Sequence, residues 1–301
     1  MTKILSGKDM IRRIREAGKD SVRKLNDAGI QPTLCIFRVG ARSEDLAYEN
    51  TIKRAAARME VNVATAEFGE DATTEEVLFA VEAASADDSI HGILVFRPMP
   101  AQIDEDAVCE SVPPGMDVDG VGILPMSLLY KSKTPADIEA LKDKTFLPAT
   151  AEASLAILKE FGIGLAGRRT VVIGRSTVIG KPIAQLLLTE DATVTMAHSK
   201  SSGLADISKG AEILIACAGI TTQDESGSVV GAIGKEYLSP GQTVIDVGMN
   251  PTDSGGLTGD VSVEDADGLV EAITPVPGGV GGVTTQLLLA HVISAAERLT
   301  A

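Results

Sequence analysis

The sequence predicts an α/β protein built from two α/β domains. Short β-rich apolar runs alternate with longer amphipathic stretches, and the alternation occurs in two series separated by a stretch without periodicity. The length of 301 residues agrees with two domains, because one domain commonly holds about 100–200 residues. In the first series, the strand–helix–strand alternation predicts a parallel sheet covered by helices on both faces.

The first series is expected to begin with an amphipathic helix and then to alternate strands with helices. Apolar residues recur at helical spacing from Ser6 onwards, and Gly29 ends the pattern. Thr73 and Glu76 have the spacing of a capping box at the start of a later helix. The expected elements are helices at residues 6–28, 43–59 and 77–84 and strands at residues 33–39, 61–68 and 92–96.

The second series follows residues 113–145, which lack sustained periodicity and are expected to be irregular. Short β-rich runs again predict strands, and the longer patterns predict helices. The expected elements are helices at residues 151–161, 181–188 and 284–299 and strands at residues 170–173, 193–196, 213–216 and 244–247.

Charge and composition narrow the class of partner. The formal net charge of −15 argues against nucleic acid, and an anionic substrate would need a local basic pocket. No segment reaches the roughly 20 apolar residues of a membrane span, and the N-terminus lacks an apolar signal-peptide core. We therefore expect no membrane association and a cytoplasmic location.

The three cysteines carry no sign of a metal or a disulfide framework. Cys35, Cys109 and Cys217 share no metal-ligand spacing, so no bound metal is expected. Cys35 and Cys217 lie inside apolar runs and are expected to be small core residues. An odd count without a framework agrees with a reducing cytoplasm.

A glycine-rich loop between an expected strand and an expected helix predicts a phosphate site. Its sequence is Gly174-Arg175-Ser176-Thr-Val-Ile-Gly180-Lys-Pro182. Unpaired N–H groups and the helix dipole at such a helix N-terminus favour an anion. Gly174 permits a tight turn, Gly180 permits close packing of helix on strand, and Pro182 fits the first helical turn. Because Ser176 replaces the middle glycine of the usual dinucleotide motif, an ordinary strand–helix turn is the alternative interpretation.

The residues after the next strand favour NADP over NAD. In a dinucleotide fold, the group that contacts the ribose 2′ position lies about 20 residues beyond the loop. His198, Ser199 and Lys200 occupy this place, and none of them is an acid that could accept a hydrogen bond from a 2′-hydroxyl. A hydroxyl and cations, with Arg175 nearby, suit a 2′-phosphate. NADP is therefore the expected cofactor, and NAD is the alternative.

Several further motifs accompany the loop. In the second half they are Val244-Ile-Asp-Val-Gly-Met-Asn250, Gly259-Asp-Val261 and Ile273-Thr-Pro-Val-Pro-Gly-Gly-Val-Gly281. In the first half they are Val39-Gly40 with Tyr48 eight residues after Gly40, His91-Gly-Ile-Leu-Val95 and Asp117-Val-Asp-Gly120. Together with the loop, these motifs resemble the methylenetetrahydrofolate dehydrogenase/cyclohydrolase family, and the resemblance spans nearly the whole chain.

The resemblance implies a fold, a reaction and an assembly. It implies a folate-binding domain, expected at residues 1–145 plus 283–301, and an NAD(P)-binding Rossmann domain, expected at residues 146–282. The last helix would return to the first domain, and the substrate would lie in the cleft between the domains. The implied reaction oxidises 5,10-methylenetetrahydrofolate to 5,10-methenyltetrahydrofolate with hydride transfer to NADP. The implied assembly is a homodimer formed through the Rossmann domain.

The resemblance also implies roles for individual residues. Tyr48 and Asp119 are the expected catalytic residues, Tyr48 against the p-aminobenzoate ring and Asp119 as an anchor of the pterin, because a carboxylate accepts two parallel N–H bonds. The substrate nitrogens stabilise the cation that forms, so orientation carries the reaction and no strong acid or base is needed. Further implied contacts are Pro277, Gly278, Gly279 and Thr284 on the substrate side and Thr150 on the cofactor side.

The sequence departs from the family where the second activity, hydrolysis of the methenyl product, should lie. The family has a Lys four residues after the Tyr and a Gln before the Pro-x-Pro segment, whereas this chain has Ile52 and Phe96 there. Apolar side chains cannot transfer a proton, so cyclohydrolase activity is expected to be absent or very weak. Lys53 is adjacent, but one residue turns a helix by about 100° and directs its side chain off the Tyr48 face.

Three alternatives stay open from the sequence. The chain is a bifunctional enzyme that uses Lys53 or water, a non-catalytic paralogue that binds folate or dinucleotide, or a Rossmann enzyme for another amine-linked one-carbon carrier. The intact Tyr48, Asp119 and phosphate loop favour a dehydrogenase over a decayed paralogue. A last departure, Gly281-Gly282-Val283 in place of Gly-Pro-Met, is expected to loosen the start of the last helix.

Overall fold

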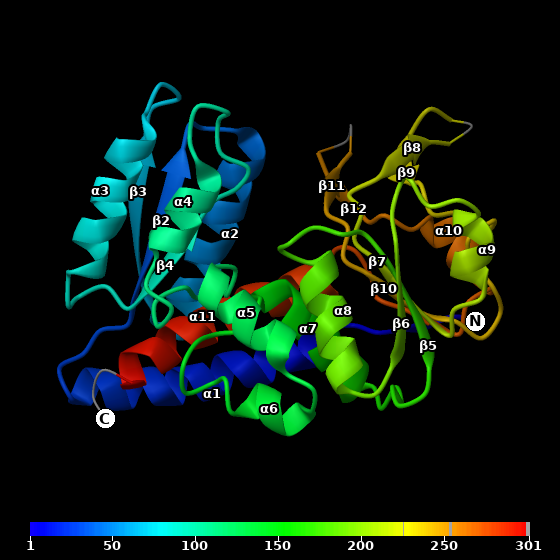
Figure 1. The fold of residues 1–301 in the computed structure, drawn as a ribbon, viewed down its shortest axis with the longest axis horizontal. Coiled ribbons are helices and arrows are strands. Elements are labelled where there is room, and N and C mark those ends of the chain that lie inside the picture. Colours follow the sequence, from blue (N-terminus) through cyan, green and yellow to red (C-terminus); the bar gives the residue numbers. More distant parts are fainter. Residues whose placement is uncertain (225, 253–254, 299–301) are drawn as a thin grey trace. The chain divides into compact units, whose positions relative to one another are not determined.

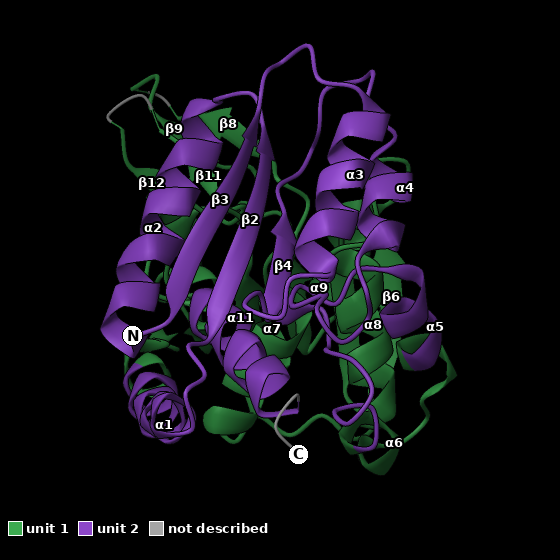
Figure 2. Cartoon of the chain, turned by 90° about the vertical axis from the view of Figure 1, so that its left-hand side faces the viewer, with its two compact units in different colours: residues 1–11, 129–139, 150–284 green, residues 12–128, 140–149, 285–301 purple. Residues whose placement is uncertain are grey.

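The computed structural model describes residues 1–224, 226–252 and 255–298. The chain forms two compact units (Figure 2). Unit 1 contains residues 1–11, 129–139 and 150–284, and unit 2 contains residues 12–128 and 140–149 and the chain from Thr285 onwards. The chain passes between the units at several points, among them within the two long helices α1 (Lys8–Asp27) and α11 (Val280–Arg298).

Unit 2 is built on a three-stranded parallel sheet in the order β3-β2-β4 (Figure 1). Its strands are β2 (Thr33–Val39), β3 (Asn62–Phe68) and β4 (Gly92–Val95). Alternate side chains of β2 enter two different cores, Leu34 and Ile36 on one face and Cys35 and Phe37 on the other. The sheet is therefore buried on both faces, as the sequence predicts.

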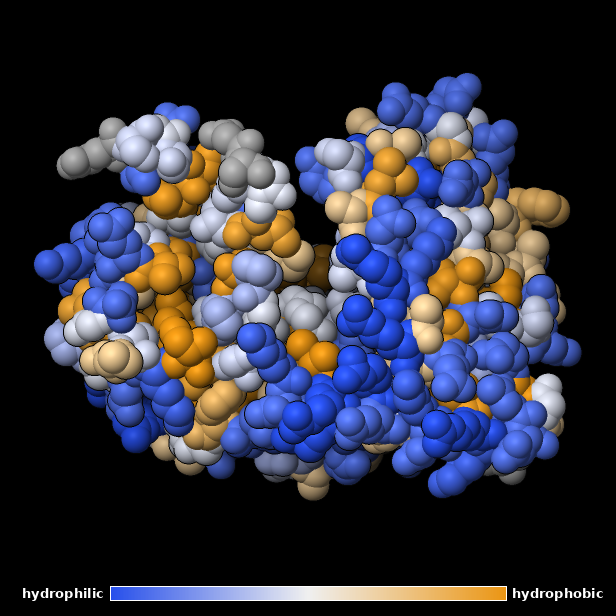
Figure 3. Space-filling model, turned by 180° about the vertical axis from the view of Figure 1, so that it is seen from behind, coloured by the Kyte–Doolittle hydropathy of each residue, from blue (hydrophilic) through white to orange (hydrophobic). Residues whose placement is uncertain are grey.

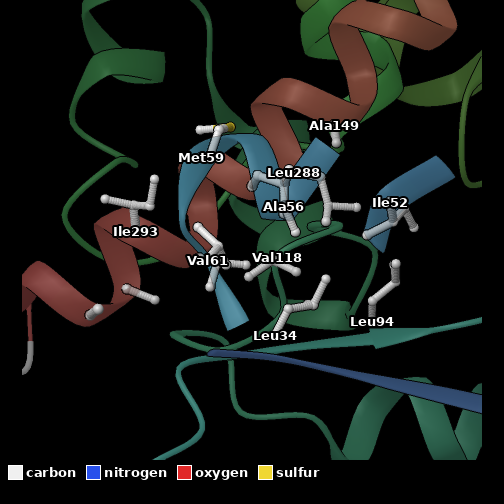
Figure 4. Close-up of a cluster of buried hydrophobic side chains, with 14 of the residues drawn as sticks. Leu34, Ile52, Ala56, Met59, Val61, Leu94, Val118, Ala149, Leu288 and Ile293 are labelled. Atoms are coloured by element: carbon white, nitrogen blue, oxygen red, sulfur yellow. The ribbon is translucent and has the colours of Figure 1, made fainter. Parts of the chain in front are cut away.

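Three helices close one face of this sheet: α1, α2 (Ser43–Met59) and α11. Figure 4 shows how Ile52, Ala56 and Met59 of α2 lie close to Leu288 and Ile293 of α11 in this core. These positions on α2 recur every three or four residues, which gives the helix one apolar stripe. The predicted amphipathic helices thus supply this layer.

The other face carries α3 (Thr74–Ser85) and α4 (Glu105–Ser111). The predicted capping box at the start of α3 is confirmed. The Glu76 N–H donates to the Thr73 hydroxyl at 3.3 Å, and the Thr73 N–H donates to the Glu76 carboxylate at 2.8 Å. The sequence analysis missed α4, which has one buried residue, Val108, and therefore shows little apolar periodicity.

Unit 1 is built on a six-stranded sheet in the order β1-β13-β10-β7-β5-β6, and every pairing in it is parallel. Its strands are β1 (Lys3–Ile4), β13 (Ala272–Ile273), β10 (Thr243–Asp246), β7 (Ile213–Ala216), β5 (Arg169–Ile173) and β6 (Thr193–Ala197). The helices α7 (Ala149–Glu160), α8 (Gly180–Thr189), α9 (Leu204–Lys209) and α10 (Val263–Ala266) connect or flank these strands. The predicted two-domain α/β fold with parallel-rich sheets is confirmed.

The direction of strand addition reverses at β5. This strand pairs with β6, which follows it in the chain, and on its other side with β7. Such a switch point leaves a crevice at the carboxyl ends of the two diverging strands, and ligands of open parallel sheets bind there. The glycine-rich loop leaves β5 at this point.

The expectation of an irregular stretch at residues 113–145 is wrong. The structure forms two short helices there, α5 (Ile123–Lys131) and α6 (Pro135–Glu139). Each is anchored by few apolar side chains, such as the buried Leu129 and Ile138, so no sustained period shows in the sequence. Two small antiparallel pairs were also missed: β8 (Thr221–Gln223) with β9 (Val229–Gly231), and β11 (Asn250–Pro251) with β12 (Leu257–Thr258).

The last helix begins earlier than the sequence predicts. It starts at Val280 and not at residue 284, so Gly281 and Gly282 form part of its first turn and do not loosen it. A Cβ atom on Gly281 would lie 2.8 Å from the sulfur of Met249, and one on Gly282 would lie 2.8 Å from Ile11. Close packing thus overrides the weak helix propensity of glycine. The predicted end at residue 299 lies outside the described residues.

Candidate active site

The glycine-rich loop occupies the switch point of the unit 1 sheet. Gly174 has a φ of 142°, and a Cβ atom on it would lie 2.5 Å from the carbonyl oxygen of Cys217, just after β7. A Cβ atom on Gly180 would lie 2.5 Å from the carbonyl oxygen of Gly174. The two strand ends and α8 therefore meet at a distance that only glycine allows, which is the close packing that the sequence predicts. Pro182 lies in the first turn of α8.

Two residues, one in this loop and one in the neighbouring loop after β7, differ from expectation. The Ser176 hydroxyl accepts hydrogen bonds from the N–H groups of Ile179 at 3.1 Å and Gly180 at 3.3 Å. The serine that replaces the usual middle glycine therefore satisfies the N–H groups of the residues where α8 begins. Cys217, expected to be a small core residue, is only half-buried, because it lies in the loop beyond the end of β7.

His198, Ser199 and Lys200 form a turn directly after β6. The N–H of Lys200 donates to Nδ1 of His198 at 3.2 Å, and the N–H of His198 donates to the Ser201 hydroxyl at 3.0 Å. The side chains of Ser199 and Lys200 are exposed, as is that of Arg175 in the loop after β5. The sequence analysis missed Ser201, which shapes this turn through its hydroxyl.

These features fit a dinucleotide. The glycines form a cradle that side chains would fill, and the N-terminus of α8 lies beside it. The turn after β6 offers a hydroxyl and a cation and carries no carboxylate at residues 198–200. The loop residues Gly174, Arg175, Ser176, Gly180 and Pro182 and the turn residues His198, Ser199 and Lys200 are thus brought to neighbouring strand ends of one sheet.

In unit 2, Tyr48 of α2 stacks on Phe96, the residue that follows β4. Their ring centroids are 5.5 Å apart, and the ring planes differ by 29°. Phe96 is buried and Tyr48 is half-buried. Burial, helped by the nearby Asp119 carboxylate, raises the pKa of Tyr48, although a hydrogen bond with Thr285 opposes this. Tyr48 is therefore a neutral aromatic surface.

The two residues that follow along α2 differ in environment. Ile52 is fully buried in the core shared by α2 and α11. Lys53 is 43% exposed, and its ammonium donates to the Glu49 carboxylate at 2.6 Å. Lys53 also lines a hollow of about 550 Å³ together with Ala47, Asn50, Thr51, Arg54 and Ala57. Tyr48, Phe96 and Asp119 do not line this hollow.

Asp119 is paired with a residue that the sequence analysis missed. Nη2 of Arg97 donates to Oδ2 of Asp119 at 2.9 Å, and the two side chains are only 16% and 18% exposed. Burial raises the pKa of Asp119 to about 6, and the Arg97 charge opposes that rise. In the sequence, Arg97 could be noticed only as a cation that follows Phe96 at the end of an expected strand. A single arginine in such a place does not by itself indicate a binding site.

Asp117 holds the backbone on which Asp119 lies. It is 4% exposed and accepts hydrogen bonds from the N–H groups of Gly120 at 3.0 Å and Gly122 at 2.8 Å. His291 of α11 contacts the carbonyl oxygen of Val118 at 2.8 Å through Nδ1. The segment that carries Asp119 is thus fixed from two sides, and neither support was predicted as a site residue.

The remaining predicted substrate contacts, and the predicted cofactor contact Thr150, lie in unit 1. Gly278 has a φ of 103°, and its carbonyl oxygen accepts from the N–H of Gly7 at 3.0 Å. Gly279 leaves no room for a side chain, because a Cβ atom there would lie 2.6 Å from the carbonyl oxygen of Pro275. Pro277 is exposed in the same turn. Thr284 is buried, and its hydroxyl donates within α11 to the carbonyl of Val280, while Thr150 is half-buried on α7.

Two buried carboxylates explain the aspartate-containing motifs of unit 1. Asp246 accepts hydrogen bonds from the N–H groups of Gly248, Asp260 and Val261 at 2.9–3.0 Å. Asp260, fully buried, accepts from the N–H groups of Ala218, Gly219 and Ile220 at 2.6–3.0 Å. These contacts join the ends of β7 and β10, so the motifs fix the loops around the switch point.

The fold and the loop define a two-unit α/β protein with a dinucleotide-type site at the switch point of its second sheet. Comparison with known proteins then identifies the family to which the chain belongs. Residues 148–300 match the NAD(P)-binding domain of the tetrahydrofolate dehydrogenase/cyclohydrolase family, and residues 5–119 match the catalytic domain of that family. The chain belongs to this family and is an NAD(P)-binding enzyme of that class.

Individual relatives agree along their whole length. The bifunctional protein FolD of Alkaliphilus oremlandii is 38% identical over 98% of this chain and 97% of its own. The structure of the bifunctional enzyme FolD of Campylobacter jejuni has a TM-score of 0.88 at 31% identity and covers 99% of each chain. The FolD structure of Trypanosoma brucei, complexed with NADP and an inhibitor, has a TM-score of 0.88 at 29% identity and covers 99% of this chain and 98% of its own.

Among the described residues, no helix has both the length and the apolar character needed to cross a membrane.

Proposed function

We propose that this protein oxidises 5,10-methylenetetrahydrofolate to 5,10-methenyltetrahydrofolate with NADP and does not hydrolyse the product at a useful rate. The substrate loses a hydride from its methylene carbon, which becomes the methenyl cation, and NADP takes up that hydride as NADPH. We assign folate binding to residues 1–145 plus 283–301 and dinucleotide binding to residues 146–282. The relatives from Alkaliphilus oremlandii and Campylobacter jejuni carry the name bifunctional, so the second half of the proposal separates this chain from them.

The observation that carries the proposal is the environment of Ile52 and Phe96. Ile52 is fully buried in the core, and Phe96 is stacked on Tyr48. Hydrolysis of the methenyl group needs a side chain that moves a proton to or from the attacking water. Neither of these side chains can do so, and both are held in place by apolar packing.

Lys53 is the side chain that the bifunctional alternative names for hydrolysis, with water as its other option. Its ammonium is engaged by Glu49 one helical turn earlier, at 2.6 Å. It lines the hollow along α2 whose lining includes neither Tyr48 nor Asp119. Lys53 therefore does not act as a relocated cation beside Tyr48.

The proposed dehydrogenase step relies on placement. Tyr48, neutral and backed by Phe96, offers its ring to the p-aminobenzoate group, and Asp119 offers carboxylate oxygens to the pterin N–H groups. In unit 1, the cradle of Gly174 and Gly180 would admit the pyrophosphate, and Ser199, Lys200 and Arg175 would meet the 2′-phosphate. NADP, when bound, supplies the nicotinamide ring that accepts the hydride. Holding the two reacting carbons in line supplies the rate enhancement.

One assay tests both halves of the proposal. Purified protein is mixed with methylenetetrahydrofolate and NADP or NAD, and NADPH and the methenyl product are followed by absorbance. We expect NADP reduction, with methenyl product that disappears only at its spontaneous rate in buffer. Stoichiometric conversion to formyltetrahydrofolate would support the bifunctional alternative, and no reduction of either nucleotide would support a non-catalytic binding protein.

The proposal includes a cytoplasmic homodimer formed through unit 1. Strand β6 ends the six-stranded sheet, and Met196 on it is 39% exposed. Leu188 of the adjacent α8 is 47% exposed. Hydrophobic side chains also gather on the part of unit 1 visible in Figure 3. An exposed apolar edge of a parallel sheet favours association, and sedimentation equilibrium would test the assembly directly.

A further inference from the structure

We propose that Arg97 is a positioning residue that orients the Asp119 carboxylate for the pterin ring. This inference rests on the proposed function, because it takes Asp119 as the pterin anchor. It adds a residue that neither the motifs nor the family resemblance identified. The Arg97–Asp119 pair lies in unit 2, where Arg97 directly follows Phe96 in the chain.

The geometry of the pair leaves the carboxylate free to bind a ligand. Arg97 donates one hydrogen bond, from Nη2 to Oδ2 of Asp119 at 2.9 Å. A carboxylate has about four acceptor positions, so most of the acceptor capacity of Asp119 stays open. The guanidinium is planar and rigid, and a hydrogen bond from it restricts rotation of the carboxylate. Arg97 can thus fix the orientation of Asp119 without occupying the whole acceptor.

The carboxylate needs such a partner because of where it lies. Its side chain is 18% exposed, and burial favours the neutral form of an acid. A neutral acid would present a proton in place of an acceptor to one of the pterin N–H groups, which weakens the paired hydrogen bonds. Burial raises the pKa of Asp119 to about 6, and the Arg97 charge is the leading effect that opposes this rise.

The other charged and titratable groups around Asp119 do not replace Arg97. Asp117 on the same segment raises the pKa of Asp119, whereas His291 on α11 lowers it less than Arg97 does. Asp119 in turn acts on Tyr48 and on Cys109, a half-buried thiol whose pKa is raised by burial to about 11 and which therefore carries no charge. The groups facing Asp119 are therefore Arg97, Asp117, His291, Tyr48 and Cys109.

The test measures binding of tetrahydrofolate directly, under anaerobic conditions, by calorimetry between pH 6 and pH 9. Arg97→Met should raise the Kd about fivefold to tenfold at pH 7, since both the orientation and the ionised form of Asp119 are weakened. The loss should shrink towards pH 9, where Asp119 ionises without help. Arg97→Lys should restore much of the affinity, because lysine keeps the positive charge. The recovery should be incomplete, because lysine lacks the planar guanidinium that fixes the carboxylate.

Two controls separate this role from a structural one. Arg42→Met removes a comparable Arg–Asp pair in the same unit, in which Arg42 contacts Asp45 at 2.8 Å, and should leave the Kd unchanged. In an Asp119→Asn background, Arg97→Met should add little, because the two residues act together. The far-ultraviolet circular dichroism of each variant reports whether it is folded, and the Kd for NADP, whose proposed site lies in unit 1, should not change.

The outcomes distinguish the inference from the proposed function. If Arg97→Met binds tetrahydrofolate as wild type does, or more tightly, the inference is overturned whatever the activity. A pH-independent loss that Arg97→Lys does not restore would also overturn it, since that pattern indicates disturbed packing. Absence of NADP reduction by a wild-type protein that binds tetrahydrofolate would overturn the proposed function alone.

Discussion

Lys53 and Glu49 form an ion pair across one turn of α2, with 2.6 Å between Nζ and Oε1. The pair engages the ammonium group that lies next in the chain to the family's lysine position. We predict that Lys53→Met changes kcat and KM of the dehydrogenase by less than about twofold, because the side chain touches none of the proposed substrate contacts. The rate at which methenyl product disappears should also stay unchanged. A wild-type hydrolysis rate that falls in this variant would establish Lys53 as the hydrolytic residue.

Glu49 itself should be important for stability. It is 4% exposed and accepts hydrogen bonds from Lys53 at 2.6 Å, Arg38 at 2.9 Å and Thr65 at 3.0 Å. We predict that Glu49→Gln lowers the free energy of unfolding by about 2–4 kcal/mol at pH 7, because it removes one charge of a buried pair. Glu75→Gln, at an exposed position of α3, should cost less than about 0.5 kcal/mol.

The pH dependence of this effect follows from the pKa of Glu49. Burial alone would raise that pKa, but the bonds with Lys53, Arg38 and Thr65 outweigh it, and the folded-state pKa is lowered. Such a group adds stability above its unfolded pKa of about 4.3, and the contribution is lost as the pH falls through the folded pKa. Urea unfolding of wild type and Glu49→Gln should therefore converge on acidification. A difference that is the same at pH 7 and pH 3 would contradict this account.

Gly180 is predicted to be essential for the dinucleotide loop. A Cβ atom there would lie 2.5 Å from the carbonyl oxygen of Gly174 and 2.9 Å from the backbone nitrogen of Arg175. Because both neighbours are backbone atoms, Gly180→Ala must shift the loop and should weaken NADP binding by at least about tenfold. Gly164→Ala is the matched control, since a Cβ atom on Gly164 meets nothing within 4 Å. Equal NADP affinity in both variants would place the phosphate site elsewhere.

Lys200 is predicted to select NADP over NAD. It is exposed in the turn after β6, next to Ser199. Lys200→Met should raise the KM for NADP about tenfold and leave that for NAD nearly unchanged, because only NADP carries the 2′-phosphate. Lys209→Met, at an exposed position of α9, should change neither value. An equal loss for both nucleotides would show that Lys200 does not contact the 2′ position.

The fold could be predicted well where one apolar face covers several turns or a whole strand. Strand β2 and helix α2 lie at the residues that the sequence predicts, since Leu34 and Ile36 alternate with Cys35 and Phe37 and the apolar stripe of α2 is regular. Helices α5 and α6 were missed because each buries too few apolar side chains to show a period. The start of α11 was misplaced because glycines packed against Met249 and Ile11 have no signal in helix propensity.

The candidate site was only partly predictable for a similar reason. The order of residues along the chain is enough to find a glycine in a recognisable loop, such as Gly174, or a residue within a known motif, such as Asp119. Arg97 gains its meaning from Asp119, 22 residues away in the chain, which the fold brings within 2.9 Å. Asp117 stands in a recognised motif, but its role lies in the hydrogen bonds that it accepts from the N–H groups of Gly120 and Gly122 at 2.8–3.0 Å. A salt bridge between residues distant in sequence leaves no periodic pattern.

The sharpest prediction concerns restoring the missing hydrolysis. Ile52→Lys together with Phe96→Gln should make the methenyl product disappear faster than its spontaneous rate, because a proton-transferring amine then lies one turn from Tyr48 with an amide beside it. Ile52 is fully buried, so an ammonium at this position must be desolvated, and the double variant should lose about 2–4 kcal/mol of stability.

The matched control for that variant is Ile52→Met with Phe96→Leu. It disturbs the stacking of Tyr48 on Phe96, whose ring centroids are 5.5 Å apart, but adds no group that transfers a proton. If the control also gains hydrolysis, water entering a loosened site is the cause and the lost lysine is not. If the Lys–Gln variant still reduces NADP yet leaves the methenyl product untouched, then Ile52 and Phe96 do not mark the missing hydrolytic site, since a folded site with both groups restored should move the proton that hydrolysis requires.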